Sequence, residues 1–190
     1  MLAASALLRK PIAVGPAGQT LYIVRVIKIP QIPLLLGALL LAGPALGVCA
    51  DSPAPGVEWR RCLLDGIDLS GRDLTGATMR DTSFARASMV GTKLVGVDAA
   101  DARFSFADMS NADLTGATLR NVDLTRAVLA GATLKGVDLR RATLFRTDLR
   151  GADLTGAELA GTNLSGAQLG GARWLDGKKI CSAASIGSCQ

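Results

Sequence analysis

The side chains that could do chemistry in this sequence are carboxylates, guanidinium groups and four cysteines, because the chain contains no histidine. The absence of histidine removes the commonest general base and the commonest metal ligand. A Ser-His-Asp or Cys-His nucleophile therefore cannot be built. Aspartates such as Asp68 and Asp73 recur at a fixed spacing instead of gathering in one cleft. The sequence predicts a protein that is not an enzyme and uses no cofactor or metal.

Arginine and phenylalanine form the one group of side chains that indicates binding. They recur at exposed positions of a repeated sequence, on what we expect to be one side of the molecule, and such residues are common in protein interfaces. Phe106 and Phe145 are expected to be exposed beside the arginines. The candidate interaction patch comprises Arg120, Arg126, Arg140, Arg141, Arg146, Phe106 and Phe145.

A five-residue repeat must position these side chains, and it runs from Cys62 to Asp176 without an insertion. We call the central position of each repeat i; it falls at residues 64, 69, 74 and so on to 174, which gives 23 repeats. Sixteen central residues are leucine. Position i−2 is alanine in 13 repeats, and position i+2 is glycine in 13. A period of five fits neither a helix nor a long alternating strand.

The period does fit three residues of strand followed by a two-residue corner. Side chains alternate along a strand, so positions i−2 and i point to the same side, which must be the interior, while i−1 faces water. Glycine, aspartate and asparagine tolerate the backbone conformations of a tight corner. Repetition of this unit predicts a solenoid in which each coil stacks only on its neighbours.

The charges at position i−1 indicate how many repeats close one coil. Stacked strands lie about 4.8 Å apart, so like charges directly above one another are unfavourable. Offsets of 15 or 25 residues would each stack four pairs of acids, whereas an offset of 20 stacks only Asp138 on Glu158. The 20-residue offset also creates four opposite-charge pairs: Asp73/Lys93, Lys93/Asp113, Arg103/Asp123 and Asp153/Arg173. The sequence therefore predicts four repeats per coil and about six coils.

Two repeats, Ala112-Asp113-Leu114-Thr115-Gly116 and Ala152-Asp153-Leu154-Thr155-Gly156, closely resemble the units of the pentapeptide-repeat family. The resemblance covers residues 62–176 and implies an all-β fold, a right-handed, four-sided β-helix. We expect residues 51–61, with Trp59, to cap the first coil and residues 177–190 to cap the last. The expected organisation is thus a leader over 1–50, two caps and the repeat domain between them.

The leader has the pattern of a secretory signal peptide. Arg25 and Lys28 precede an apolar stretch over residues 32–48, and small residues before Asp51 predict cleavage after Ala50. The stretch is marginal as a membrane span, so a retained anchor over residues 32–48 is the alternative. Because 50 residues is long for a signal peptide, translation starting near residues 21–26 is a further hypothesis. The expected location is periplasmic or secreted.

The cysteines are interpreted from this expected export. In an oxidising compartment Cys181 and Cys189 are expected to form a disulfide that closes the C-terminal cap. The tail after Trp174 also resembles the tails of secreted pentapeptide-repeat proteins. Removal of Cys49 with the leader would leave Cys62 as an unpaired, buried thiol.

Two classes of function remain. The first is a structural or protein-binding module in the bacterial cell envelope, with an unknown protein partner. The second is a cytoplasmic DNA mimic that binds a type II topoisomerase (gyrase), as some quinolone-resistance members of the family do. A mimic needs an acidic surface, yet residues 62–174 carry 13 acidic and 13 basic side chains. No nucleic acid is expected as a partner. A monomer is favoured because both ends look capped, with an end-to-end dimer as the alternative.

Overall fold

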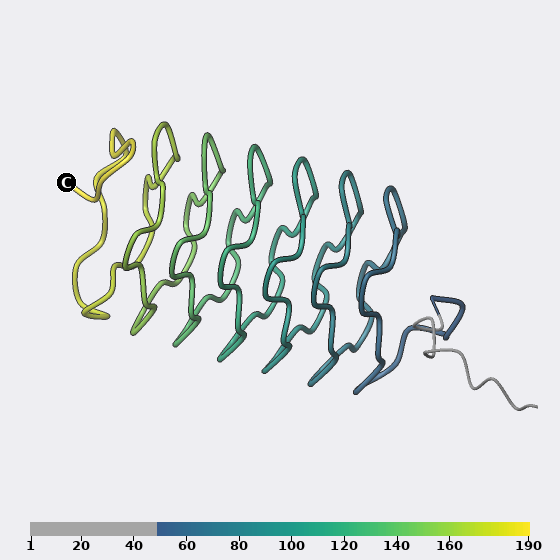
Figure 1. Ribbon diagram of the computed structural model, residues 1–190. Coiled ribbons are helices and arrows are strands. Elements are labelled where there is room, and N and C mark those ends of the chain that lie inside the picture. Colours follow the sequence, from purple (N-terminus) through teal and green to yellow (C-terminus); the bar gives the residue numbers. More distant parts are fainter. Residues whose placement is uncertain (1–48) are drawn as a thin grey trace, which may run out of the picture. The chain divides into compact units, whose positions relative to one another are not determined.

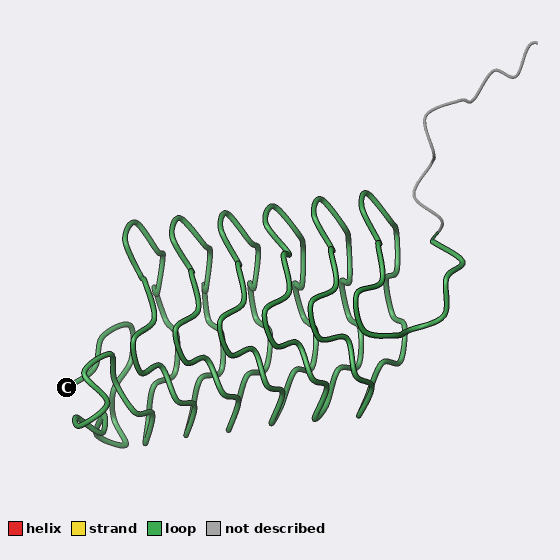
Figure 2. Cartoon of the chain, turned by 90° about the horizontal axis from the view of Figure 1, so that it is seen from below, coloured by secondary structure: helices red, strands yellow, loops and turns green. Residues whose placement is uncertain are grey.

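The computed structural model describes residues 49–190, so the predicted leader, apart from Cys49 and Ala50, lies outside the described residues. Within 49–190 the chain winds through a stack of similar coils (Figures 1 and 2). This part of the chain contains no helix and no continuous strand, and its β-structure consists of single-residue bridges. No helix within the described residues could therefore cross a membrane.

The bridges fix the register of the coils. Parallel bridges join residues twenty apart, from Glu58 and Thr78 to Asp153 and Arg173. Around each bridge, the N–H of residue i donates to the carbonyl of position i−1 in the next coil; the Leu119 N–H donates to the Asp138 carbonyl at 2.8 Å. This offset confirms four repeats per coil and places position i−1 of successive coils in one column on each face.

The corners explain the composition of the repeat. Position i+2 has a positive φ, such as 66° at Gly116, and the N–H of the following residue closes the turn on the carbonyl of position i, as Ala117 does on Leu114 at 3.0 Å. An aspartate at i−1 accepts hydrogen bonds from position i+1. Asp113 Oδ1 accepts from the backbone N–H of Thr115 at 3.0 Å and from its hydroxyl at 2.6 Å. The repeat thus satisfies its own polar groups at each corner.

The interior is built from positions i and i−2. Most central side chains are fully buried, and alanine, valine or threonine at i−2 fills the space between them. Phe84 and Phe104, twenty residues apart at central positions, stack with ring centroids 5.1 Å apart and planes at 6°. Met89 and Met109 are also fully buried. Each such side chain stabilises the folded state by roughly 1.5–3 kcal/mol.

The first coil begins earlier than the sequence indicates. Trp59 is 1% exposed, and its ring lies 6.2 Å from that of Phe84 in the next coil. Glu58 already bridges to Thr78, so residues 57–61 have the register of a repeat with tryptophan at the central position. The predicted cap over 51–61 is therefore shorter, because part of it is a coil.

The N-terminal cysteines are paired in the chain that retains Cys49. Cys49 and Cys62 form a disulfide with their sulfur atoms 2.05 Å apart. The unpaired Cys62 expected after cleavage at Ala50 requires the loss of Cys49, so it stays a prediction.

The C-terminal segment covers only half of the last coil. Cys181 and Cys189 form a disulfide, and antiparallel bridges join Gln168 to Ile186 and Arg173 to Ile180. On the remaining edge of this coil, the backbone N–H groups of Leu159, Gly161, Leu164 and Gly166 have no hydrogen-bond partner among residues 49–190. Gly187 lies close to Leu164 and Gly166, so that part of the edge is covered but not paired. The C-terminal end is thus half open, and the expectation of a monomer stays a prediction.

Candidate functional site

The structure divides the predicted patch between two neighbouring corners of the rod. Residues twenty apart share a corner, so five of the arginine and phenylalanine side chains lie at one corner of the stack, which we call the Arg–Phe corner. The Arg–Phe corner comprises Arg86, Phe106, Arg126, Phe145 and Arg146. The preceding corner of each coil holds Arg80, Arg120, Arg140 and Arg141.

Aromatic rings order the guanidinium groups of the Arg–Phe corner. The Phe106 side chain, 49% exposed, lies between Arg86 and Arg126, whose Cζ atoms are 5.9 and 5.6 Å from its ring centroid. Arg146 Cζ lies 5.1 Å from the Phe145 ring centroid. These distances are within the range of cation–π attraction. Phe106 is exposed as expected, whereas Phe145, also expected to be exposed, is half-buried.

The backbone at this corner holds bulky residues in a conformation that suits glycine. Arg86, Phe106, Arg126 and Arg146 have φ values of 59°, 61°, 57° and 55°. The left-handed conformation costs a residue with a Cβ atom roughly 1–2 kcal/mol. Gly66 and Gly166 occupy the same position in the first and last coils. The same conformation recurs at position i+2 of the other corners, for example at Arg61 and Arg141, so it is a property of the repeat and not of this corner alone.

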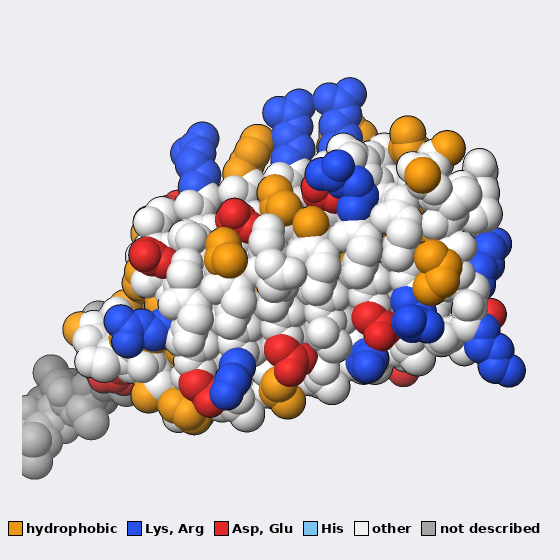
Figure 3. All heavy atoms as spheres, turned by 180° about the vertical axis from the view of Figure 1, so that it is seen from behind, with side chains coloured by type: hydrophobic (Ala, Val, Ile, Leu, Met, Phe, Trp, Pro, Cys, Tyr) orange, Lys and Arg blue, Asp and Glu red, His pale blue; other side chains and the backbone are white. Residues whose placement is uncertain are grey.

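The arginines of the Arg–Phe corner are not neutralised. Among residues 49–190, no acidic side chain lies within ion-pair distance of Arg86, Arg126 or Arg146. All three are exposed. Figure 3 shows lysine and arginine side chains projecting next to one another along one edge of the rod, with hydrophobic side chains between them. This corner therefore presents net positive charge together with apolar surface.

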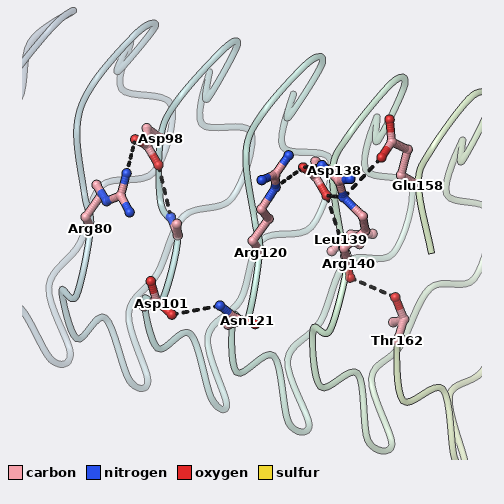
Figure 4. Close-up of polar contacts among 11 residues, drawn as sticks. Arg80, Asp98, Asp101, Arg120, Asn121, Asp138, Leu139, Arg140, Glu158 and Thr162 are labelled. Atoms are coloured by element: carbon pink, nitrogen blue, oxygen red, sulfur yellow. Dashed lines mark hydrogen bonds and ion pairs between the residues drawn. The ribbon is translucent and has the colours of Figure 1, made fainter. Parts of the chain in front are cut away.

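The other corner differs because Arg80, Arg120 and Arg140, at position i+1, pair with acids of the adjoining face (Figure 4). Arg120 forms an ion pair with Asp138. Arg140 Nη2 lies 2.8 Å from Asp138 Oδ2, and its Nε lies 3.2 Å from Glu158 Oε2, so Arg140 bridges the one acid-on-acid pair in the stack. Arg120 and Arg140 are therefore neutralised by acids, unlike the arginines of the Arg–Phe corner, and their place in the interaction patch stays a prediction.

Arg141 also lies away from the Arg–Phe corner. It occupies position i+2 of the corner that holds Arg140, with φ of 60°. A Cβ atom on Gly161, in the next coil, would lie 3.5 Å from Arg141 Cγ. No ion pair involves Arg141 among the described residues, but its column contains Asp101 and Asn121 where the Arg–Phe corner has Phe106 and Arg126.

Cations pair with the acids on the faces of the rod that carry Asp148 and Asp153. Arg150 Nη2 lies 2.6 Å from Asp148 Oδ2, and Lys135 Nζ lies 3.4 Å from Asp153 Oδ2. Hydrogen bonds from the Arg150 side chain lower the pKa of Asp148, because they stabilise its charged form. Within residues 49–190, no group of three or more acidic or cysteine side chains is arranged to hold a metal ion. The surface around Asp148 and Asp153 is therefore mixed in charge.

The repeat itself decides the family. The family model described as "Pentapeptide repeats" matches residues 62–98, 107–144 and 138–173 with eight copies, which together span more than half of the chain. The chain belongs to the pentapeptide-repeat family. Pentapeptide repeats form a four-sided β-helix, which agrees with the twenty-residue offset of the bridges.

Individual pentapeptide-repeat proteins of known structure resemble this chain over part of its length. HetL of the cyanobacterium Nostoc sp. strain PCC 7120, involved in heterocyst differentiation regulation, is 29% identical over 66% of this chain and 75% of its own, with a TM-score of 0.34. A thylakoid-lumen protein of Arabidopsis thaliana is 27% identical over 68% and 85%, with a TM-score of 0.30. QnrB1, a plasmid-mediated fluoroquinolone resistance protein, is 20% identical over 62% and 65%, with a TM-score of 0.38. A search of curated proteins found no match.

Proposed function

We propose that this protein is a non-enzymatic binding module, a right-handed β-helical rod of about six coils that binds a protein partner through the Arg–Phe corner. The observation that carries the proposal is the contrast between two corners. Arg126 and Arg146 have no acidic neighbour among the described residues, whereas Arg120 and Arg140 are paired. Arginine and aromatic side chains are enriched in the energetically important parts of interfaces.

The DNA-mimic alternative finds less support. It requires a continuous acidic surface, and the acid columns of the described residues contain cations, such as Lys93 within 3.8 Å of Asp73 and Arg150 beside Asp148. A mixed surface of this kind attracts neither a protein that binds DNA nor DNA itself over a long range.

A matched pair of variants tests the binding proposal. We expect Arg126→Gly combined with Arg146→Gly to reduce capture of the partner from envelope extracts at least tenfold. The control, Arg120→Ser combined with Arg140→Ser, removes the same charge from the neighbouring corner and should leave capture unchanged. Serine is native at position i+1 in other repeats, for example Ser70 and Ser110. Equal capture by both double variants and the natural protein would exclude the corner as the binding surface.

We also propose that the protein works in the cell envelope, outside the cytoplasm. The leader pattern over residues 25–48 supports export, and so do two disulfides, because disulfides persist in oxidising compartments. A cleaved chain that keeps Cys49 in its disulfide must be cut before that residue. The segment Ala45-Leu46-Gly47 has small residues at the third and first places before Val48, which is the pattern of a cleavage site.

Mass spectrometry of the mature N-terminus tests this processing. We expect a chain that begins at Val48 in the periplasmic or secreted fraction, with Cys49 linked to Cys62. A chain that begins at Asp51 would show that the Cys49–Cys62 disulfide is absent from the mature protein. Recovery of an uncleaved, reduced chain from the cytosol would refute the proposed location.

A further inference from the structure

We propose that the partner presents an extended acidic peptide segment, which lies along the rod axis on the Arg–Phe corner. This inference rests on the proposed function and names the chemistry of the partner. It follows from the spacing of the corner's cations, the width of the positive surface and the hollow at its C-terminal end.

The spacing of the arginines matches an extended peptide. Arg86 and Arg146 lie three coils apart in one column, a separation of about 14 Å between their backbones at 4.8 Å per coil. Carboxylates at three alternate positions of an extended chain span about 13 Å. One such segment can therefore place its end acids opposite Arg86 and Arg146, while its middle acid, about 6.6 Å along, lies between Phe106 and Arg126 and within reach of the long Arg126 side chain. The ring of Phe106, held between two of these guanidinium groups, orders them before binding and so reduces the entropy lost.

The positive surface is narrow, and beyond the corner it extends on one face only to Arg103, which is exposed and lies next to Asp123 in its column. Asp108 and Asp148 follow the corner by two residues on one face, and Asp123 precedes it on the other. A nucleic-acid duplex or an anionic membrane is broader than the corner and would bring its phosphates close to these carboxylates. A single peptide strand contacts the corner alone, so the flanking acids favour a protein segment.

The C-terminal end of the corner opens into a hollow of about 340 Å³. Arg146 and Arg150 line one part of it, and Gln168 and Ile186 line another. Ile186 is 63% exposed, which is unusual for a side chain of this size in this protein. The hollow therefore suits an apolar side chain that follows the last acid of the segment.

A synthetic peptide provides the test. The probe is fluorescein-labelled Glu-Thr-Glu-Thr-Glu-Leu, titrated with the disulfide-bonded protein and followed by fluorescence anisotropy. We expect saturable binding that weakens as salt is added, since exposed charges are screened. Arg126→Gly combined with Arg146→Gly should weaken binding at least tenfold. Arg120→Ser combined with Arg140→Ser should not change it, and a peptide with glutamine in place of glutamate should not bind.

The melting temperature separates lost binding from lost folding. Glycine adopts the positive φ of Arg126 and Arg146 without the penalty of a Cβ atom, so the double glycine variant should melt no lower than the natural protein. A variant that binds tenfold more weakly and is equally or more stable supports the inference. Undiminished peptide binding by this variant would overturn it.

Two further results would also overturn the inference. One is the absence of peptide binding, and the other is equal or tighter binding of an oligodeoxythymidine or of phosphatidylglycerol vesicles. If capture from extracts still depends on Arg126 and Arg146 while the peptide does not bind, only the acidic-segment inference fails. If capture is also independent of these arginines, the proposed function fails with it.

Discussion

Replacement of Leu119 by aspartate is expected to unfold the rod. Leu119 is 1% exposed at a central position, and its N–H donates to the Asp138 carbonyl of the next coil. The substitution removes a buried leucine, which alone costs about 2–5 kcal/mol, and places a carboxyl group where the interior offers no cation. Since domains of this size are stable by only about 5–15 kcal/mol, the loss should abolish the cooperative melting transition seen by circular dichroism.

Thr143→Asp is the matched control for this experiment. Thr143 occupies position i−1, directed away from the interior, and it lies between Asp123 and Asn163 in its column. The same carboxylate placed there should change the free energy of unfolding by about 1 kcal/mol or less. A normal melting curve for Leu119→Asp would show that the assignment of inward and outward positions is wrong.

Trp59→Ala is expected to be the most destabilising change near the N-terminus, with a loss of about 3–5 kcal/mol in the free energy of unfolding. Trp59 is the largest fully buried side chain, and it closes the stack by packing on Phe84. Removal of the indole leaves a large cavity at the end of the rod and uncovers the ring of Phe84. Chemical denaturation with urea measures the loss, with Trp174→Ala as the comparison, because Trp174 is only half-buried.

Trp59→Phe adds a second test of the same site. The indole Nε1 of Trp59 is buried and has no hydrogen-bond partner among residues 49–190. An unsatisfied buried donor costs about 1–3 kcal/mol, so phenylalanine should recover much of the stability that alanine loses. Equal destabilisation by Phe and Ala would instead indicate that the indole N–H contributes a stabilising contact.

The register of the fold could be predicted because exposed side chains of opposite charge recur twenty residues apart. Asp73 lies twenty residues before Lys93, and the structure joins them by both a bridge and an ion pair. The interior could be predicted because every repeat places leucine or a substitute at the same position. The stacking of Phe84 on Phe104 then follows from their spacing alone.

The allocation of arginines could not be predicted from position on a face. An arginine at i+1 can reach the acid at i−1 of its own repeat, as Arg140 reaches Asp138 and Arg150 reaches Asp148. An arginine at i+2 itself has the left-handed conformation, and Arg126, for example, does not pair with Asp123 of its own repeat. Arg120 pairs instead with Asp138, at position i−1 of the next coil. An acid two residues before an arginine, or eighteen residues after it, is therefore the signal that could have separated the two groups. The Cys49–Cys62 disulfide was missed for another reason, since it depends on where the leader is cut.

The Arg–Phe corner depends on the twenty-residue offset between its side chains, whereas the interior does not. Nearly every repeat places the same kind of side chain in the interior. The stack would therefore pack almost as well after the loss of one five-residue repeat between Phe106 and Arg126. The surface would not survive that change, because each later residue would turn by one face and Arg126 would leave the corner of Phe106. Only insertions or deletions of whole twenty-residue coils preserve both the packing of the interior and the alignment of the surface side chains. In this fold, a change in length can therefore erase a binding surface while hardly disturbing stability.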